Sequence, residues 1–482
     1  MKQKLTLSLC AICISVILNL SCQKELSCED CQNGNIAENR APVANAGADQ
    51  AITIPIDSVL LDGNLSFDPD GTIVYYQWKQ IAGPGSANIF SPQSVQTIVD
   101  ALVEGVYEFE IKITDNGGLT SKDTVWVSVN RIVTNVCNNT NRPNVSTQLI
   151  PIGFISEPRI GMSVAFAGNK ILFAGGSISL GQYSSRVDIY DISNNNWSTA
   201  ELCAGRMNMA AISAGNKIFF GGGEHGGGPV DSVDIYDALT NNWTVSHLSA
   251  ARSLIAAATV GNKVIFAGGD PDLGPMDAAK VVDIYDLTNN TWSIASLSES
   301  KRNGHSAVTI NNKIYIAGGE AWMDYFIDVF CTKRIDIYDN ATNSWSSSLL
   351  NQGKVYHAGL AVNGKIYWAG GGTGTFPSVT TTCSVQILDI NTGSISIQQL
   401  SEPTNYRGHN AGIKNGKIIF MGQQQPQTNK FDIYDITTNT WSIGILPVIM
   451  TDATIISVNN TVYVAGGMIN GTLSNRVWKL EF

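Results

Sequence analysis

Charged residues are scarce in this chain of 482 residues: only 15% are Asp, Glu, Lys or Arg, and the net charge is −10. No cluster of Lys and Arg is present that could displace counterions from phosphates, so the composition argues against a nucleic-acid partner. A hydrophobic content of 44% is too high for a largely disordered chain. The length exceeds what one ordinary core absorbs, which predicts at least two folded units.

Long apolar runs are also rare. One lies at the N-terminus, from Leu5 to Leu20, and it is too short to span a membrane comfortably. Two lysines precede it, which is typical of a signal peptide, here residues 1–21. The following stretch "LNLSC" resembles a bacterial lipoprotein signal, in which the cysteine, here Cys22, becomes the lipidated first residue. That family usually has Leu where Asn19 stands, and ordinary secretion with a chance cysteine is the alternative.

This resemblance implies an exported protein that contacts the membrane through a lipid anchor only. Gln23 is not the Asp that retains many such lipoproteins at the inner membrane, so an outer-membrane or cell-surface position is expected. Residues 22–40, rich in Gln, Asn, Glu and Ser, have no apolar period and are predicted to be a flexible tether.

Residues 41–131 contain short alternating runs separated by Asp-Gly and Asn-Gly-Gly turns, which predicts a small antiparallel sandwich. The turn Asp68-Pro69-Asp70-Gly71, the strand Tyr76-x-Trp78 and the segment Thr114–Gly118 resemble an immunoglobulin-like PKD domain. Trp78 lies on the apolar face of its run and is expected in the core. Asp68, Asp70 and Asp115 are expected to bond turn backbone, with Ca²⁺ binding as the alternative. Residues 132–144 are polar and predicted to be a linker.

One short pattern, which we call the apolar phrase, occurs seven times at intervals of 44 to 52 residues: a lysine or threonine, several apolar residues and then glycine, as in "NKILFAGG". This period is typical of four-stranded propeller blades and predicts seven of them. The phrases meet the first glycine at Gly175, Gly222, Gly268, Gly318, Gly370, Gly422 and Gly466. The glycine pair is expected to allow close backbone approach and positive φ.

A tyrosine and a tryptophan follow most of these phrases one turn apart, which predicts aromatic pairs between adjacent blades. Together with the glycines they resemble the kelch repeat over residues 145–482. The sequence departs from it at Met421-Gly422-Gln423 in blade six, and at Ile387-Leu388-Asp389 with Ile395 in blade five. The expected fold is all-β: an immunoglobulin-like PKD sandwich, then a seven-bladed kelch propeller closed by an N-terminal strand. Residues 145–152 are expected beside the C-terminal strand, which removes exposed edges.

Three arginines precede innermost strands, and a carboxylate follows each one 18 residues later, just past the glycines. The expected pairs are Arg206 with Glu224, Arg252 with Asp270, and Arg302 with Glu320. They would form either a polar mouth for an acidic or hydroxylated ligand or, as we favour, rim salt bridges.

Three histidines, His305, His357 and His409, stand at one offset in blades four to six and are expected to face the central channel. Hydrogen bonds along the channel are favoured over a metal site, because rings from neighbouring blades are too far apart to converge on one ion.

The loop after Gly319 is long and carries four aromatic residues, Trp322, Tyr325, Phe326 and Phe330. Exposed aromatics on a rigid scaffold predict ligand binding, and the alternative is that they fold onto the rim. Cys331 and Cys383 fall at nearly equivalent points of this loop and the next, so they are a candidate disulfide.

The function expected from these features is non-catalytic binding of a glycan or protein ligand through the propeller loop face, without a cofactor. Kelch propellers include galactose-oxidase-like and mutarotase-like enzymes, so a carbohydrate-active enzyme using the channel mouth is the alternative. The copper-oxidase ligand set cannot be carried over residue by residue. A structural spacer is a third class, since fold does not determine function.

Overall fold

The structure, a computed structural model, describes residues 39–53, 56–130, 137, 142–272, 279–298, 301–322, 329–375, 378–405, 411–424 and 428–482. All of its named elements are β-strands, and the predicted fold class is confirmed. In the part of the chain that is described, no helix is long and apolar enough to cross a membrane. The signal segment, Cys22, Tyr325, Phe326 and His409 lie outside the described residues.

The first unit is a sandwich of two sheets with strand orders β1-β7-β6-β3 and β2-β5-β4. The strands are β1 (Gln50–Thr53), β2 (Val59–Asp62), β3 (Ile73–Ala82), β4 (Asn88–Ile89), β5 (Gln96–Asp100), β6 (Gly105–Asp115) and β7 (Thr120–Asn130). β1 runs parallel to β7, and the other pairs are antiparallel. Trp78 is buried in the core as predicted, and its indole N–H donates to the Ser94 carbonyl.

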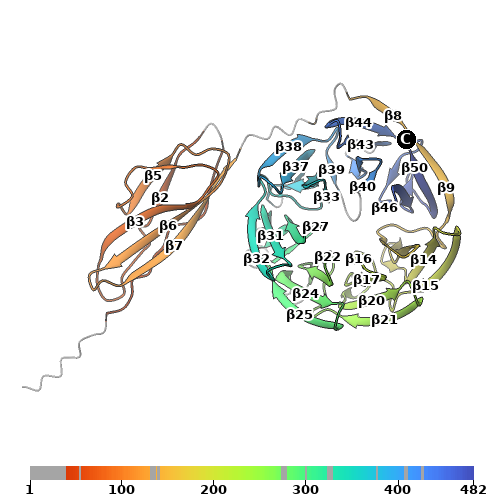
Figure 1. Ribbon diagram of the computed structural model, residues 1–482, viewed down its shortest axis with the longest axis horizontal. Coiled ribbons are helices and arrows are strands. Elements are labelled where there is room, and N and C mark those ends of the chain that lie inside the picture. Colours follow the sequence, from red (N-terminus) through yellow and green to blue (C-terminus); the bar gives the residue numbers. More distant parts are fainter. Residues whose placement is uncertain are drawn as a thin grey trace, which may run out of the picture.

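The second unit is a ring of seven sheets built on four antiparallel strands each, and the sheet of blade six has a fifth, parallel strand (Figure 1). Their innermost strands are β10 (Ser163–Ala167), β16 (Ala210–Ala214), β22 (Ala256–Val260), β27 (Ser306–Ile310), β33 (Ala358–Val362), β40 (Ala411–Lys414) and β46 (Thr454–Val458). The second strands are β11 (Lys170–Ala174), β17 (Lys217–Gly221), β23 (Lys263–Ala267), β28 (Lys313–Ala317), β34 (Lys365–Ala369), β41 (Lys417–Phe420) and β47 (Thr461–Ala465). These second strands carry the repeated apolar phrase and are buried.

The outer half of each sheet completes the blade. The third strands are β14 (Arg186–Asp191), β20 (Ser232–Asp237), β24 (Val281–Asp286), β31 (Arg334–Asp339), β37 (Ser384–Asp389), β43 (Lys430–Asp435) and β50 (Arg476–Glu481). The outermost strands are β15 (Asn196–Glu201), β21 (Asn242–His247), β25 (Thr291–Ser296), β32 (Ser344–Leu349), β38 (Ile395–Gln399), β44 (Thr440–Ile445) and β9 (Gln148–Phe154). Blade seven therefore takes its outermost strand from the start of the unit.

The two ends of the propeller meet in blade seven. β9 pairs antiparallel with β50, from Gln148 opposite Glu481 to Phe154 opposite Arg476, and the two strands lie side by side in Figure 1. The innermost strand β46 of blade seven contacts β10 of blade one. β50 therefore has a hydrogen-bonded neighbour on both sides and is not left as an exposed edge.

In every blade except blade six, a glycine pair joins the blade to the next one. The first glycine has a φ near +60°, as at Gly175, and the N–H of the second donates to a carbonyl of the following blade. Gly176 donates to the Arg206 carbonyl at 3.0 Å, and Gly467 of blade seven donates to the Arg159 carbonyl of blade one at 3.0 Å. A Cβ on Gly175 would lie 2.3 Å from the Arg206 oxygen, so only glycine fits this approach.

The repeated Tyr and Trp form a pair within one sheet, directly opposite each other on its two outer strands, rather than between two blades. The Tyr190 and Trp197 rings lie 4.9 Å apart, and the hydroxyl of Tyr190 donates to the side chain of Asn195. Asn195 has a φ of 61°, a conformation that Asn tolerates in tight turns. The pair then packs on the preceding blade, as Tyr236 and Trp243 do on the sheet of blade one.

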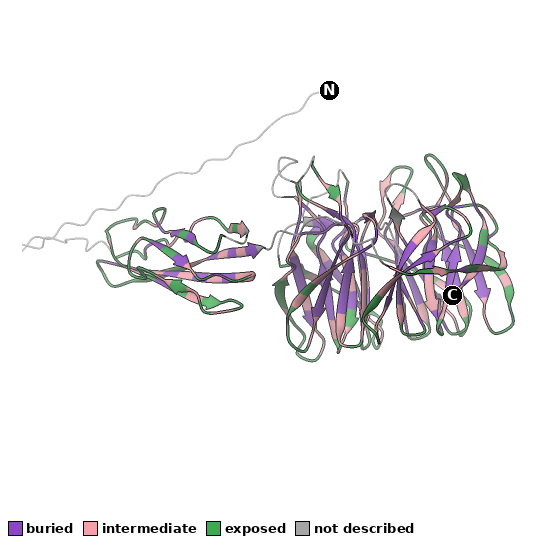
Figure 2. Ribbon diagram, turned by 90° about the horizontal axis from the view of Figure 1, so that it is seen from above, coloured by how far each residue is buried: buried purple, intermediate pink, exposed green. Residues whose placement is uncertain are grey.

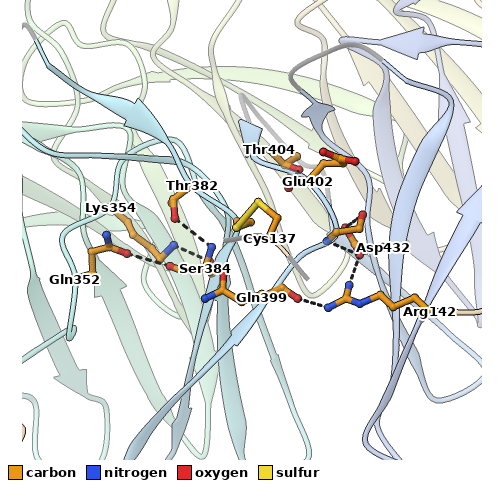
Figure 3. The surroundings of a disulfide bond; sticks show 12 residues. Cys137, Arg142, Gln352, Lys354, Thr382, Ser384, Gln399, Glu402, Thr404 and Asp432 are labelled. Carbon is orange, nitrogen blue, oxygen red and sulfur yellow. Dashed lines mark hydrogen bonds and ion pairs between the residues drawn. A yellow bond between two sulfur atoms is a disulfide. The ribbon is translucent and has the colours of Figure 1, made fainter. Parts of the chain in front are cut away.

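The predicted linker, residues 132–144, is tied to the propeller. Cys137 forms a disulfide with Cys383 of blade five, and the Arg142 guanidinium pairs with Asp432 of blade six at 2.6 Å (Figure 3). The short strand β8 (Asn144–Ser146) then runs parallel to β44. We call residues 137 and 142–147 the strap, because they fasten blades five and six ahead of β9.

The sandwich also contacts the propeller at blade four. The Asn351 side chain donates to the Glu104 carboxylate at 3.1 Å, and the Arg334 guanidinium lies 5.5 Å from the Trp126 ring. Contacts between the described residues of the two units thus include a hydrogen bond and a cation–π contact, the latter of a kind worth about 0.5–2 kcal/mol.

Candidate functional site

Five glycine pairs send the chain into a two-stranded hairpin on one face of the ring, which we call the hairpin face. The hairpins are β12 (Ser177–Ser179) with β13 (Gln182–Tyr183), β18 (Glu224–His225) with β19 (Gly228–Pro229), β29 (Glu320–Trp322) with β30 (Val329–Cys331), β35 (Gly372–Thr373) with β36 (Thr380–Thr381), and β48 (Met468–Ile469) with β49 (Thr472–Leu473). In blade six, β42 (Gln423–Gln424) pairs with β39 (Thr404–Asn405). The segments leading into blades four and seven add β26 (Lys301–Asn303) to β29 and β45 (Met450–Thr451) to β48. Figure 2 shows the ring edge-on, with loops projecting above and below the sheets.

The hairpins of blades four and five are joined by backbone contacts. Phe330 forms a bridge with Thr375, and the Cys331 N–H donates to the Gly374 carbonyl at 2.9 Å. The backbone of the predicted ligand residue Trp322 pairs with Lys301 and Val329, and Phe330 is half-buried. Two neighbouring blades thus share one continuous platform on the hairpin face.

The predicted disulfide between Cys331 and Cys383 is wrong. Cys383 bonds to Cys137, whereas Cys331 is a free, buried thiol whose pKa is raised to about 12 by burial. The sequence pattern missed this because the linker looked like a polar spacer, although Cys137 packs with the apolar cluster of blade five. Cys203 is also free, and it is exposed.

The predicted rim pairs of the arginines are also wrong. The arginine side chains are buried and pair with an aspartate on the third strand of their own blade. The pairs are Arg159 with Asp188, Arg206 with Asp234, Arg252 with Asp283, and Arg302 with Asp336. Arg206 also donates to the Phe220 carbonyl at 3.1 Å. These arginines lie inside the blades and not at the mouth, where Glu224, Asp270 and Glu320 stand on the hairpin side.

Each such pair ties three segments together. Asp234 accepts the Arg206 guanidinium through one oxygen and the Cys203 backbone N–H through the other, at 2.9 Å. The Arg206 carbonyl meanwhile accepts from Gly176 of blade one. Burial is the main reason that the pKa values of Arg159, Arg252 and Arg302 are lowered from 12.5, and the facing aspartates oppose the shift. Guanidinium groups nevertheless stay charged in proteins. We call the buried arginine and the aspartate of the third strand that it pairs with, such as Arg206 and Asp234, the arginine bolt.

Blades five and six depart from the bolt in informative ways. Blade five has Lys354 and Gln386 at the two positions, and burial lowers the pKa of Lys354 to about 7. The Lys354 ammonium donates to the carbonyls of Gly370 and Ser384, both at 2.8 Å. Blade six has Asp432, but Thr404 stands at the arginine position, because its carbonyl accepts from Gly371 as that of Arg206 does from Gly176. Arg142 of the strap supplies the guanidinium. An aspartate without its arginine is thus the sequence signal that could have revealed the strap.

His305 and His357 are buried and bond to the preceding blade. Nε2 of His305 donates to the Ala267 carbonyl at 2.9 Å, and Nε2 of His357 lies 2.9 Å from the Ser306 hydroxyl. Burial, helped by nearby Arg302, lowers the pKa of His305 to about 3, and burial also holds the pKa of His357 well below its ordinary value. Both rings are neutral at pH 7, and Nε2 of each forms a hydrogen bond to the preceding blade.

The aspartates of the sandwich bond to turn backbone. Asp115 accepts from the N–H groups of Gly117 and Leu119 at 2.9 and 2.8 Å, and Asp70 accepts from the Arg40 N–H at 3.0 Å. Asp68 accepts from the Asp70 N–H at 3.3 Å. Among the residues that the structure describes, no group of three or more His, Cys, Asp or Glu is placed to hold a metal ion.

A pocket that the sequence did not indicate lies at the outer rim of blade seven. Its volume is about 450 Å³, and it lies between the loop that leads into this blade and the end of its hairpin. Its walls are formed by Leu149, Pro447, Val448, Ile469, Thr472, Leu473, Ser474, Asn475, Arg476 and Trp478.

Comparison with known families matches both units. A PKD-domain family matches residues 46–129, "KLHDC2/KLHL20/DRC7 Kelch-repeats domain" matches residues 116–319, and "Kelch motif" matches residues 301–347. The chain therefore contains a PKD-like domain followed by kelch repeats. Fold and site define a two-unit all-β protein of a kind suited to a binding or structural role.

Curated relatives match over a length close to one domain. The rat dyslexia-associated protein KIAA0319 homolog is 38% identical over 93 residues, which is 19% of this chain and 8% of that protein. Human low-density lipoprotein receptor-related protein 11 is 40% identical over 90 residues, 19% of this chain and 18% of that protein. The chain thus spans less than a fifth of either relative. A solved structure of YjhT aligns at 13% identity with a TM-score of 0.43, covering 68% of this chain and 95% of that one.

Proposed function

We propose that this protein is an exported, lipid-anchored binding protein whose hairpin face takes a glycan or protein ligand without catalysis. The observation that carries the proposal is the platform of blades four and five, where Phe330 meets Thr375 and Cys331 bonds to Gly374. Two neighbouring hairpins that support each other can hold a ligand in one fixed geometry, and binding residues are often found on such loops above a rigid scaffold.

The ring beneath this face is built for rigidity. Arg206, Arg252 and Arg302 are buried in bolts, and His305 and His357 are neutral and bonded between blades. These groups, which the sequence offered for a polar channel mouth, stabilise the scaffold. The chemistry available for recognition therefore lies on the hairpins, above all in the aromatic segment that begins at Trp322.

The disulfide between Cys137 and Cys383 supports export, because such bonds persist in oxidising compartments. In this proposal Cys22 carries the lipid at the outer membrane or cell surface, and the sandwich holds the propeller away from the bilayer. Membrane contact is through the lipid anchor only.

A glycan array tests the proposal directly. The wild type is compared with a variant that carries Trp322→Ala and Tyr325→Ala, and with Leu239→Ala as a matched control. Leu239 is 71% exposed and follows the third strand of blade two, on the turn face opposite the hairpins. We expect the double variant to lose binding at least tenfold and the control to bind as the wild type does. Equal binding by all three proteins would remove the blade-four hairpin from the proposal.

A further inference from the structure

Blade seven lacks both halves of the arginine bolt. Met450 stands 16 residues before Gly466, where four other blades carry the bolt arginine, and Trp478 stands where they carry the aspartate. Both side chains are buried, Met450 at 8% and Trp478 at 5% exposure. The sheet pairing supports this equivalence, because the carbonyl of Arg476 accepts from Gly466 as that of Ser232 does from Gly222 in blade two.

The pocket of about 450 Å³ lies beside this changed position. In blade two the corresponding place holds Cys203, which contacts the bolt through Asp234 and Arg206. In blade seven Pro447 replaces Cys203, and the indole of Trp478 forms part of the wall. Blade seven thus has Met450, Trp478 and Pro447 where blade two has a compact cluster of arginine, aspartate and cysteine, and an open cavity lies beside these apolar residues.

Arg476 provides the charge of the pocket. Its counterpart in blade one, Arg186, pairs across the strands with Glu201 at 2.7 Å. Opposite Arg476 stands Phe154, which is 62% exposed and offers no carboxylate. Within the described part of the chain, the Arg476 guanidinium has no ion pair or side-chain hydrogen bond. An exposed guanidinium beside a cavity with both polar and apolar walls favours an anion, and its planar fork fits a carboxylate in two-point contact.

The remaining walls match a sugar ring. Thr472 and Asn475 offer a hydroxyl and an amide that can pair with sugar hydroxyls, while Leu149, Val448 and Trp478 offer an apolar surface to the C–H face. A volume of about 450 Å³ lies in the range of small-molecule sites and holds one or two sugar units.

We propose that the blade-seven pocket binds an acidic sugar unit, with Arg476 holding its carboxylate. The assignment rests on the glycan-binding role proposed above and narrows that role to a carboxylated ligand at a second place on the rim. It does not involve the aromatic segment of blade four.

The experiment measures binding of free monosaccharides to the exported protein by ligand-observed NMR and calorimetry. The probes are D-glucuronate, D-galacturonate and N-acetylneuraminate, each compared with neutral D-glucose and D-galactose. Arg476→Gln removes the charge, and Arg186→Gln is the matched control, since it removes an exposed arginine at the equivalent position of blade one. The melting temperatures of both variants verify that they are folded.

We expect at least one acidic sugar to bind at least tenfold tighter than the neutral sugars, and Arg476→Gln to weaken it at least tenfold, because charged hydrogen bonds to an arginine have this size. Arg186→Gln should leave affinity unchanged. Equal affinity for acidic and neutral sugars, absence of binding by all three acids, or retained binding in folded Arg476→Gln would overturn the assignment.

The glycan array separates this failure from failure of the proposed function. Array binding that survives Arg476→Gln but is lost with the Trp322 and Tyr325 double variant would sink the pocket and leave the hairpin-face role standing. Array binding that is lost with Arg476→Gln but survives the double variant would do the reverse.

Discussion

Replacement of Arg142 by Ala tests whether the strap completes blade six. Arg142 is almost fully buried, pairs with Asp432 at 2.6 Å and lies 4.8 Å from the Trp441 ring. Removing one partner of a buried ion pair costs about 3–5 kcal/mol, because the other charge stays buried without compensation. Asp432 keeps hydrogen bonds from Ser401, at 3.0 Å from both its N–H and its hydroxyl, so we expect the lower end, about 3 kcal/mol.

The pH dependence of this cost follows from the pKa of Asp432. Burial raises that pKa from 3.8 to about 6 although Arg142 opposes the shift. A raised carboxyl pKa means that protonation favours the fold: the contribution is full below pH 3.8 and is lost as the pH rises through about 6. Loss of Arg142 raises the pKa further, so the cost of the variant should shrink by about 1 kcal/mol between pH 7 and pH 5.

Urea unfolding followed by tryptophan fluorescence at pH 7 and pH 5 measures both effects. Arg186→Ala is the matched control, since the Arg186 pair with Glu201 is solvent-exposed and worth about 1 kcal/mol or less. A cost for Arg142→Ala no greater than that of the control, or a cost that grows toward pH 5, would refute the view that the strap supplies a missing structural cation.

Three further changes should have measurable effects. The pKa of His305 is about 3 in the fold against an ordinary value of 6.5, so the stability it contributes above pH 6.5 is lost as the pH falls toward 3. In urea titrations, His305→Gln should reduce the fall in unfolding free energy between pH 7 and pH 5 by about 2 kcal/mol, and an unchanged fall would contradict this. Alkylation of the native protein should label Cys203 and spare Cys331, and rapid labelling of Cys331 would count against its burial. Cys137→Ser, which removes the disulfide, should lower the unfolding free energy by about 2–5 kcal/mol. Gly175→Ala, at a φ of 63° with the Arg206 oxygen of blade two 2.3 Å from the new Cβ, should cost about 3 kcal/mol or more by thermal unfolding, against about 1 kcal/mol for the same change at open Gly215. Equal costs would argue against close contact between blades one and two.

Regular features of the molecule could be predicted from the sequence because each one repeats. The apolar phrase and its glycines mark the second strand of a sheet and the step to the next blade, as Gly176 and Gly467 show. The Asp-rich turns and Trp78 likewise point to a sandwich with a buried tryptophan. In each case residues close together in the sequence are enough to determine the local structure.

Features that depend on pairing across long distances were missed. The sequence predicts Arg206 beside Glu224 because the entry to the innermost strand and the loop after the glycines share one face of the ring. Its partner Asp234 instead lies on β20, two strands out from the innermost strand β16. Cys137 and Arg142 belong to a polar stretch without any period, and only the fold brings them to Cys383 and Asp432. The blade-seven pocket arises where two repeat positions change together, which only a blade-by-blade alignment reveals.

Hydrogen exchange with and without an array-identified ligand tests the central claim, recognition on the hairpin face, most directly. We expect ligand-dependent protection in residues 320–322 and 329–331 and in the facing segment 372–375, with none in the turns 191–196 and 237–242 on the opposite face. Protection confined to those turns or to the sandwich would contradict the account.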